Sequence, residues 1–202
     1  MKYGSATSID YTKVADGGNP LTVADAKSHL RVTNSDEDGY ISTLVSVART
    51  WVEEHTRRCL MSTTWDLDID CGFPAADSPI ILPWAPLQSV TSISYYDADG
   101  SLTVLSSSLY EVDTSEVLGI VRPVYQTEWP SARFQSDAVT IRYVSGYGAS
   151  ADSVPPMLVH AMRLIVGHLY AFREPVVVGT IPTAIPMTVT DILAPFRVGG
   201  GL

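Results

Sequence analysis

Four aspartates are the first group in the sequence whose spacing matches a known kind of site. They are Asp66, Asp68, Asp70 and Asp77. They occupy positions 1, 3, 5 and 12 of a calcium-loop template, but the template needs glycine at position 6, where this chain has Cys71, and glutamate at position 12. Because residues 63–70 alternate strictly between apolar and polar side chains, we predict a half-buried strand with an acidic outer face rather than a calcium loop.

The histidines and cysteines do not form a recognisable metal site either. The histidines are His29, His55, His160 and His168. None belongs to an HExxH motif, and none joins a cysteine pair at zinc spacing, so we expect each to pack on a helix or to lie at a rim. With only Cys59 and Cys71 present, free thiols in a reducing compartment are expected, and no metal.

Motifs for covalent or phosphate chemistry are absent from the sequence. Gly146 and Gly148 lack the following Lys-Ser/Thr pair of a phosphate loop and predict a turn, and there is no GxSxG nucleophile elbow. The 22 acidic residues allow many carboxylate pairs, but no pair is singled out. Trp84 and Trp129 are expected in the core, with a ligand groove as the alternative. We predict no catalytic site and no cofactor.

A helical hairpin over residues 21–60 is the most strongly patterned stretch. Thr22 is expected to N-cap a first helix and Ser35 a second, and Arg57 and Arg58 fall where the helix macrodipole favours positive charge. The second helix carries one apolar stripe: Ile41, Leu44, Val45, Ala48, Trp51, Val52 and His55. Such a stripe requires a partner surface.

The expected partner is a helix over residues 155–173, opened by two prolines. Its apolar positions are Leu158, Ala161, Met162, Ile165, Leu169 and Phe172. After a Pro-, Val- and Thr-rich stretch, Ile192, Leu193 and Phe196 lie near the C-terminus, where a docking segment is expected. The two alternatives for this group are docking on another protein and folding back on its own domain.

Between the two helical parts the chain is rich in short strand patterns with turn residues between them. The predicted strands or apolar runs are 63–70, 79–84, 90–96, 101–105, 109–112, 119–122 and 138–144. Residues 1–20 show neither helical nor strand periodicity and are predicted to form a flexible arm. The fold class is therefore α+β, with a helical bundle core (about 22–31, 36–57 and 155–173), an inserted antiparallel β-region (about 63–145) and extended termini.

This organisation divides the chain into five predicted parts. They are an arm (1–20), a helical hairpin (21–62), an inserted β-region (63–150), a core helix (151–174) and a C-terminal docking tail (175–202). The composition, 46% hydrophobic and 17% charged, is that of a folded soluble protein, and no apolar run approaches the ~18 residues of a membrane span. The formal net charge of -9 disfavours binding to DNA phosphates.

The order of several sequence blocks resembles the head-to-tail connector (adaptor, or head-completion) family of long-tailed bacteriophages and gene transfer agents. The blocks are residues 20–32, 36–38, 51–58, 82–90, 129–130, 144–148 and 155–173. No block is catalytic, and the resemblance covers roughly residues 20–198. The family pattern does not account for residues 1–20.

The resemblance implies a structural virion protein with no enzymatic activity. Relatives form a ring, dodecameric in the family, below the portal protein; it continues the DNA channel and provides a platform for stopper or tail-completion proteins. DNA would pass through the lumen without specific binding, and assembly would occur in the host cytoplasm. By this resemblance, we expect Ile192, Leu193 and Phe196 to dock on the portal. The alternatives are a monomeric β-domain that binds a ligand and, further away, an unrecognised hydrolase.

Overall fold

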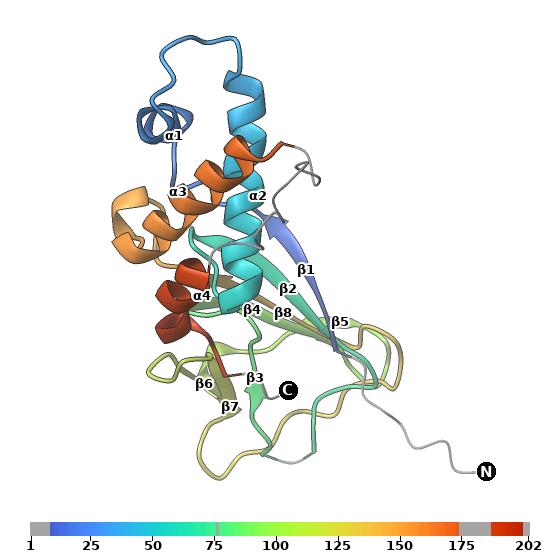
Figure 1. The fold of residues 1–202 in the computed structure, drawn as a ribbon. Helices are drawn as coiled ribbons and strands as arrows, with labels where there is room; N and C mark the ends of the chain where they lie inside the picture. Colours follow the sequence, from blue (N-terminus) through green and yellow to red (C-terminus); the bar gives the residue numbers. More distant parts are fainter. Residues whose placement is uncertain (1–8, 76, 174–186, 200–202) are drawn as a thin grey trace, which may run out of the picture. The chain divides into compact units, whose positions relative to one another are not determined.

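The computed structural model of the protein combines α-helices with antiparallel β-sheets, as the sequence predicts at this level (Figure 1). It describes residues 9–75, 77–173 and 187–199. The chain divides into two compact units. The β unit comprises residues 1–16 and 62–146, and the helical unit comprises residues 17–61 and 147–202.

A five-stranded antiparallel sheet forms most of the β unit, with the strand order β1-β2-β8-β4-β5. Its strands are β1 (Ile9–Ala15), β2 (Thr63–Ile69), β4 (Leu87–Tyr96), β5 (Leu102–Val104) and β8 (Val139–Ser145). β8 is the last of them in sequence but lies in the middle of the sheet, where it pairs with both β2 and β4.

The predicted alternation of β2 is confirmed. Trp65, Leu67 and Ile69 are buried, and the aspartates between them are partly exposed. On the exposed side, Arg142 of β8 donates from Nε and Nη2 to the two carboxylate oxygens of Asp66, at 2.8 and 2.7 Å. The acidic face therefore forms cross-strand pairs, and β2 is a strand of the sheet, not a calcium loop.

β1 corrects the prediction that residues 1–20 contain no strand. It pairs with β2 in antiparallel register, with Ile9 opposite Ile69 and Lys13 opposite Trp65. All seven of its residues are exposed, and it lies at the edge of the sheet. A strand without a buried face has no apolar alternation, which is the signal that the sequence analysis depends on.

A second, three-stranded antiparallel sheet completes the β unit. Its order is β3-β7-β6, formed by β3 (Ile80–Ile81), β7 (Ile120–Pro123) and β6 (Tyr110–Asp113), and a short 3-10 helix, η1 (Ser107–Leu109), precedes β6. All three strands coincide with or overlap predicted apolar runs.

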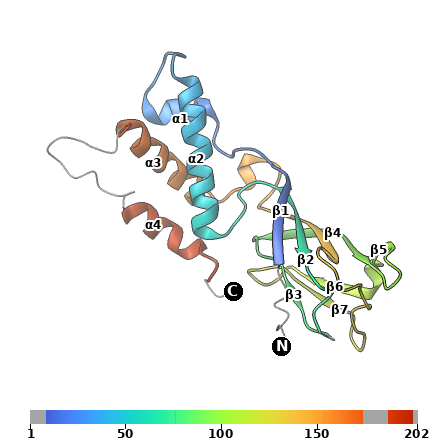
Figure 2. The ribbon, with the colours of Figure 1, turned by 90° about the vertical axis from the view of Figure 1, so that its right-hand side faces the viewer.

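Within the described residues, four α-helices and two further 3-10 turns form the helical unit (Figure 2). They are α1 (Val23–Leu30), α2 (Asp38–Thr56), α3 (Pro156–Ala171) and α4 (Met187–Leu193), with η2 (Ala151–Ser153) before α3 and η3 (Ala194–Phe196) after α4. Packing joins α2 to α3, α1 to both of them, and α4 to α2 and α3. One continuous apolar cluster, with members from every one of these α-helices, is the core of this unit.

One of the two predicted helix caps is present. Thr22 caps α1, because its hydroxyl accepts the backbone N–H of Asp25 at 3.0 Å. Ser35 does not cap α2: the N-cap residue is Glu37, its side chain makes no capping bond, and the helix begins at Asp38. Glu37 instead accepts hydrogen bonds from the hydroxyl of Tyr170 and the guanidinium of Arg173.

Candidate functional site: a hollow and an arginine end

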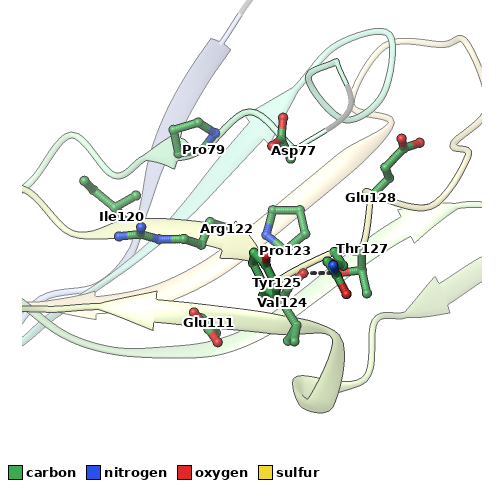
Figure 3. A pocket seen from close by; sticks show the side chains of 11 residues that line it. Asp77, Pro79, Glu111, Ile120, Arg122, Pro123, Val124, Tyr125, Thr127 and Glu128 are labelled. Atoms are coloured by element: carbon green, nitrogen blue, oxygen red, sulfur yellow. Dashed lines mark hydrogen bonds between the residues drawn. The ribbon is translucent and has the colours of Figure 1, made fainter.

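An open hollow of about 810 Å³ lies on the β unit, beside β7 and the turn that follows it (Figure 3). Its walls are largely apolar and are formed by Pro79, Ile120, Pro123, Val124 and Tyr125. We call it the Tyr125 hollow.

The turn after β7 is fixed by several hydrogen bonds. Val124 donates its N–H to the carbonyl of Leu109 at 3.2 Å, and the N–H and hydroxyl of Thr127 both donate to the carbonyl of Val124, at 3.0 and 2.6 Å. These bonds hold Tyr125 on the surface, where 83% of it is exposed. A large aromatic side chain held out in this way is typical of a contact residue.

Three carboxylates, those of Asp77, Glu111 and Glu128, lie on different sides of the hollow (Figure 3). The cation among its lining residues is Arg122, whose Nη2 lies 2.9 Å from the Oδ2 of Asp113. The pKa of Asp113 is lowered, first by hydrogen bonds from Ser115 and then by Arg122, so this carboxylate is anionic and engages the arginine. The hollow is thus acidic at its rim.

Three arginines gather where α2 ends, and we call Arg57, Arg58 and Arg197 the arginine end of the helical unit. The Nε of Arg58 donates to the carbonyl of Phe196 at 2.6 Å, and Val198 donates its N–H to the carbonyl of Thr56 at 3.0 Å. These bonds hold the segment after η3 against the end of α2. The negative end of the helix dipole favours these cations.

The pKa of His55 is affected by the arginine end. Its ring stacks on Trp51, with the centroids 4.8 Å apart. Burial lowers the pKa of His55 below 6.5, and the positive charge of Arg197 lowers it further. The stack holds the imidazole ring of His55 against Trp51 of the same helix, so His55 is a packing residue.

Charge is divided unevenly between the two units. Residues 1–16 and 62–146 carry 13 acidic and 5 basic side chains, a formal charge of -8; residues 17–61 and 147–202 carry 9 acidic and 8 basic side chains, a formal charge of -1. Nearly all of the net charge of -9 therefore belongs to the β unit. The acidic rim of the hollow is part of this unit.

The sequence-predicted helical residues lie in the core of the helical unit. Trp51 and Leu169 pack against it and are partly buried, and the others are buried members of the cluster: Ile41, Leu44, Val45, Ala48, Val52, Leu158, Ala161, Met162 and Ile165.

Ile192, Leu193 and Phe196 also lie against this core. Leu193 is fully buried in the apolar cluster, and Ile192 and Phe196 are partly buried on it. The structure therefore has the arrangement in which this group folds back on its own domain. Portal docking by the exposed parts of Ile192 and Phe196 stays a prediction, whereas Leu193 has no exposed surface to offer.

Trp84 and Trp129 do not line a groove. They are 4% and 8% exposed, respectively. Trp84 stacks on Trp65 at 4.9 Å, and Trp129 stacks on Phe73 at 5.0 Å and donates its indole N–H to the carbonyl of Ser78 at 2.9 Å. Both tryptophans are core residues, so the ligand-groove alternative loses its predicted residues.

No group of three or more metal-ligating side chains occurs within residues 9–75, 77–173 and 187–199. In the same part of the chain, no helix is both long and apolar enough to cross a membrane. Cys59 is buried and Cys71 is half-buried, and both are present as thiols, as predicted.

A buried ion pair in α2 was missed by the sequence analysis. Arg49 and Glu53 are 6% and 7% exposed, with the Nε of Arg49 3.0 Å from the Oε1 of Glu53. The same oxygen accepts the backbone N–H of Leu60 at 2.8 Å, which fixes the turn after α2. The four-residue spacing of the pair is readable in the sequence, but its burial is not.

Residues 20–115 match the family model described as phage gp6-like head-tail connector protein. The fold is similar to that of three solved structures. The neck of an empty gene transfer agent (GTA) particle computed with C6 symmetry gives a TM-score of 0.74 at 23% identity, and it covers 96% of this chain and 98% of that chain. The neck of a native GTA particle computed with C12 symmetry gives 0.73 at 22%, and the virion of a native GTA particle gives 0.71 at 22%, both with the same coverage. No curated protein matches the chain. The resemblance predicted from the sequence is confirmed by these matches.

Proposed function

We propose that this chain is a head-tail connector protein of the phage or GTA type, and that it acts as a ring-forming adaptor in the neck of a virion. The ring lies below the portal, extends the DNA channel and provides the platform on which stopper or tail-completion proteins dock. The observation that supports this most is the joint match of residues 20–115 to the connector family and of nearly the whole chain to the fold of GTA neck structures.

A ring of several copies is part of this proposal. Two of the similar structures are described as necks computed with C6 and C12 symmetry, which supports a cyclic assembly, and we propose a dodecamer. A closed cyclic ring uses heterologous contacts, so each subunit needs two different complementary patches. The helical bundle core predicted from the sequence stays part of this proposal, as the rigid scaffold of each subunit.

The charge of the protein fits a channel wall that does not bind DNA tightly. With a formal charge of -9, the chain repels the phosphate backbone overall, so DNA slides past it without specific contacts. This role requires no chemistry, and we propose that the protein is not an enzyme.

The test is to mix the purified full chain with rings of the portal protein from the same particle. We expect a stoichiometric complex on sedimentation and a ring of added density below the portal in electron micrographs. A protein that stays monomeric with portal rings, and that is missing from purified particles, would refute the proposal.

The portal-docking prediction needs its own variant, because truncation of the tail would also remove Leu193 from the core. Ile192→Asp alters a partly exposed position on α4. The matched control is Met157→Asp, which changes a 47% exposed residue of α3. We expect weaker portal binding for the first variant only; equal binding by both would remove Ile192 from the docking surface.

A further inference from the structure

The two edges of the large sheet are poorly suited to pairing with another copy. β1 carries Lys13 within the strand and an irregular register between Lys13 and Ala15, and β5 is only three residues long. Charged side chains, bulges and short strands are the features by which natural proteins block edge-to-edge pairing. The subunit contact of a ring is therefore expected on side-chain surfaces.

The Tyr125 hollow is such a surface, because it combines concavity, apolar walls and an exposed aromatic ring. Among the residues that the structure describes, no cation forms an ion pair with Asp77, Glu111 or Glu128, whereas Arg122 is engaged by Asp113. The hollow therefore offers a flat tyrosine ring beside three carboxylates. A guanidinium group suits such a place, since it stacks on aromatic faces and pairs with carboxylates.

The arginine end of the helical unit presents this chemistry. Arg57 and Arg197 are exposed, and Arg58 is held by Phe196. Arg57 has a partner on its own helix, Glu54, at 3.0 Å. Arg197 has no carboxylate partner among the described residues, and its charge acts on His55 instead.

We propose that the arginine end of one subunit docks in the Tyr125 hollow of the next subunit, with Arg197 stacked on Tyr125 and facing Glu111 and Glu128. This inference rests on the proposed ring and specifies its contact. The occupant is a second copy of the chain because the two surfaces are complementary in charge and both are present on every subunit. Each subunit thus carries one basic patch and one concave, acidic patch, which are the two different surfaces that the heterologous contact of a closed ring requires.

Charge reversal tests the contact in the full chain. The two variants are Arg197→Glu and Glu128→Lys, both at exposed positions. Matched controls reverse exposed charges elsewhere in each unit: Arg31→Glu in the helical unit and Asp99→Lys in the β unit. Ring formation is followed by sedimentation velocity with and without portal rings, and circular dichroism checks that each variant is folded.

Each reversal alone should weaken self-association by about tenfold or more, since like charges meet across the contact. An equal mixture of Arg197→Glu and Glu128→Lys should assemble again, to within about threefold of the unaltered protein. In an alternating ring, one contact has both original side chains, and in the next contact the two substituted side chains meet with their charges exchanged. Restoration by mixing requires a contact between copies, so a contact within one chain would not produce it.

Tyr125→Ala provides a second measurement that does not alter charge. It should weaken association while leaving the salt dependence unchanged, whereas raising the salt concentration should weaken the unaltered contact. Both control variants should assemble as the unaltered protein does.

The results separate this contact from the proposed function. If the unaltered protein forms rings on the portal and both reversals form them equally well, the contact is refuted and the adaptor role stands. If the unaltered protein forms no ring, the proposed function fails, and the contact fails with it. Loss of double-stranded DNA binding by Arg197→Glu, without loss of association, would show that the arginine end faces DNA and would also overturn the proposal.

Discussion

Leu193→Ala is the substitution that best separates a core role of the C-terminal segment from a docking role. Among the described side chains of α4, Leu193 and Val189 are the fully buried ones. Burying a Val or Leu side chain contributes about 1.5–3 kcal/mol, so the pair holds α4 with roughly 3–6 kcal/mol before ordering costs. Large-to-small core substitutions of this kind lower stability by about 2–5 kcal/mol. Because the seven-residue α4 can detach while the rest of the protein stays folded, the loss cannot exceed the free energy that holds α4 in place. We expect Leu193→Ala to lower the free energy that holds α4 on the core by about 2–3 kcal/mol.

Amide hydrogen exchange measures this loss where it occurs. A cost of about 2–3 kcal/mol corresponds to roughly 30- to 150-fold lower protection of the α4 amides, while protection in α2 changes little. Ile192→Ala, at a partly buried neighbouring position, is the matched control and should lower protection by less than about tenfold. Protection of α4 within about threefold of the unaltered protein would show that Leu193 does not anchor the helix and is available to a partner.

Three further predictions concern the two cores. Glu53→Ala should lower the free energy of unfolding by about 3–5 kcal/mol, because the Arg49 charge stays buried without its carboxylate. In urea denaturation, Arg49→Met combined with Glu53→Gln should recover most of this lost stability. A double variant as unstable as Glu53→Ala would contradict this reasoning. Burial lowers the pKa of His55, so on acidification the unfolded chain takes up the imidazole proton at a higher pH than the folded protein does. The free energy of unfolding should therefore fall as the pH drops from 6.5 toward the pKa of the folded protein. His55→Gln should remove that part of the pH dependence, and an unchanged pH profile in this variant would contradict the prediction. Gly119→Ala should lower the free energy of unfolding of the β unit by about 1–3 kcal/mol, since the added Cβ would lie 2.3 Å from Leu87 Cδ2 and 2.6 Å from Leu87 Cβ. The measurement is thermal unfolding, and an unaltered melting temperature would refute this steric overlap.

The elements that the sequence predicts well are those with one buried face. β2 alternates between buried Trp65 or Leu67 and half-buried acids, and the stripe on α2 repeats at helical spacing, because in both elements the core selects the residue type. The short strands between prolines and glycines were found from their turn residues. Most of the fold class could therefore be predicted without the structure.

The features that were missed depend on contacts distant in sequence. β1 has no buried face, and it is a strand only because β2, much later in the chain, supplies its hydrogen bonds, with Ile9 opposite Ile69. Ser35 has the residue type of a cap, but Tyr170 and Arg173 fix Glu37 at the start of α2 instead. The hollow brings residue 77 together with residues 111–128, and no spacing rule connects them. Interaction surfaces of this kind are assembled by tertiary structure.

The central position of β8 affects how the protein is made. A ribosome delivers β1, β2, β4 and β5 before β8, yet β2 and β4 have no contact in the sheet except through β8. The large sheet therefore cannot form until residue 145 has emerged, and α3, which follows soon after, completes the packing of α2. Both units fold late in synthesis, so a chain released before residue 139 would expose two unfinished apolar cores. We expect such nascent chains to depend on chaperones, and full-length chains to reach the native state soon after release.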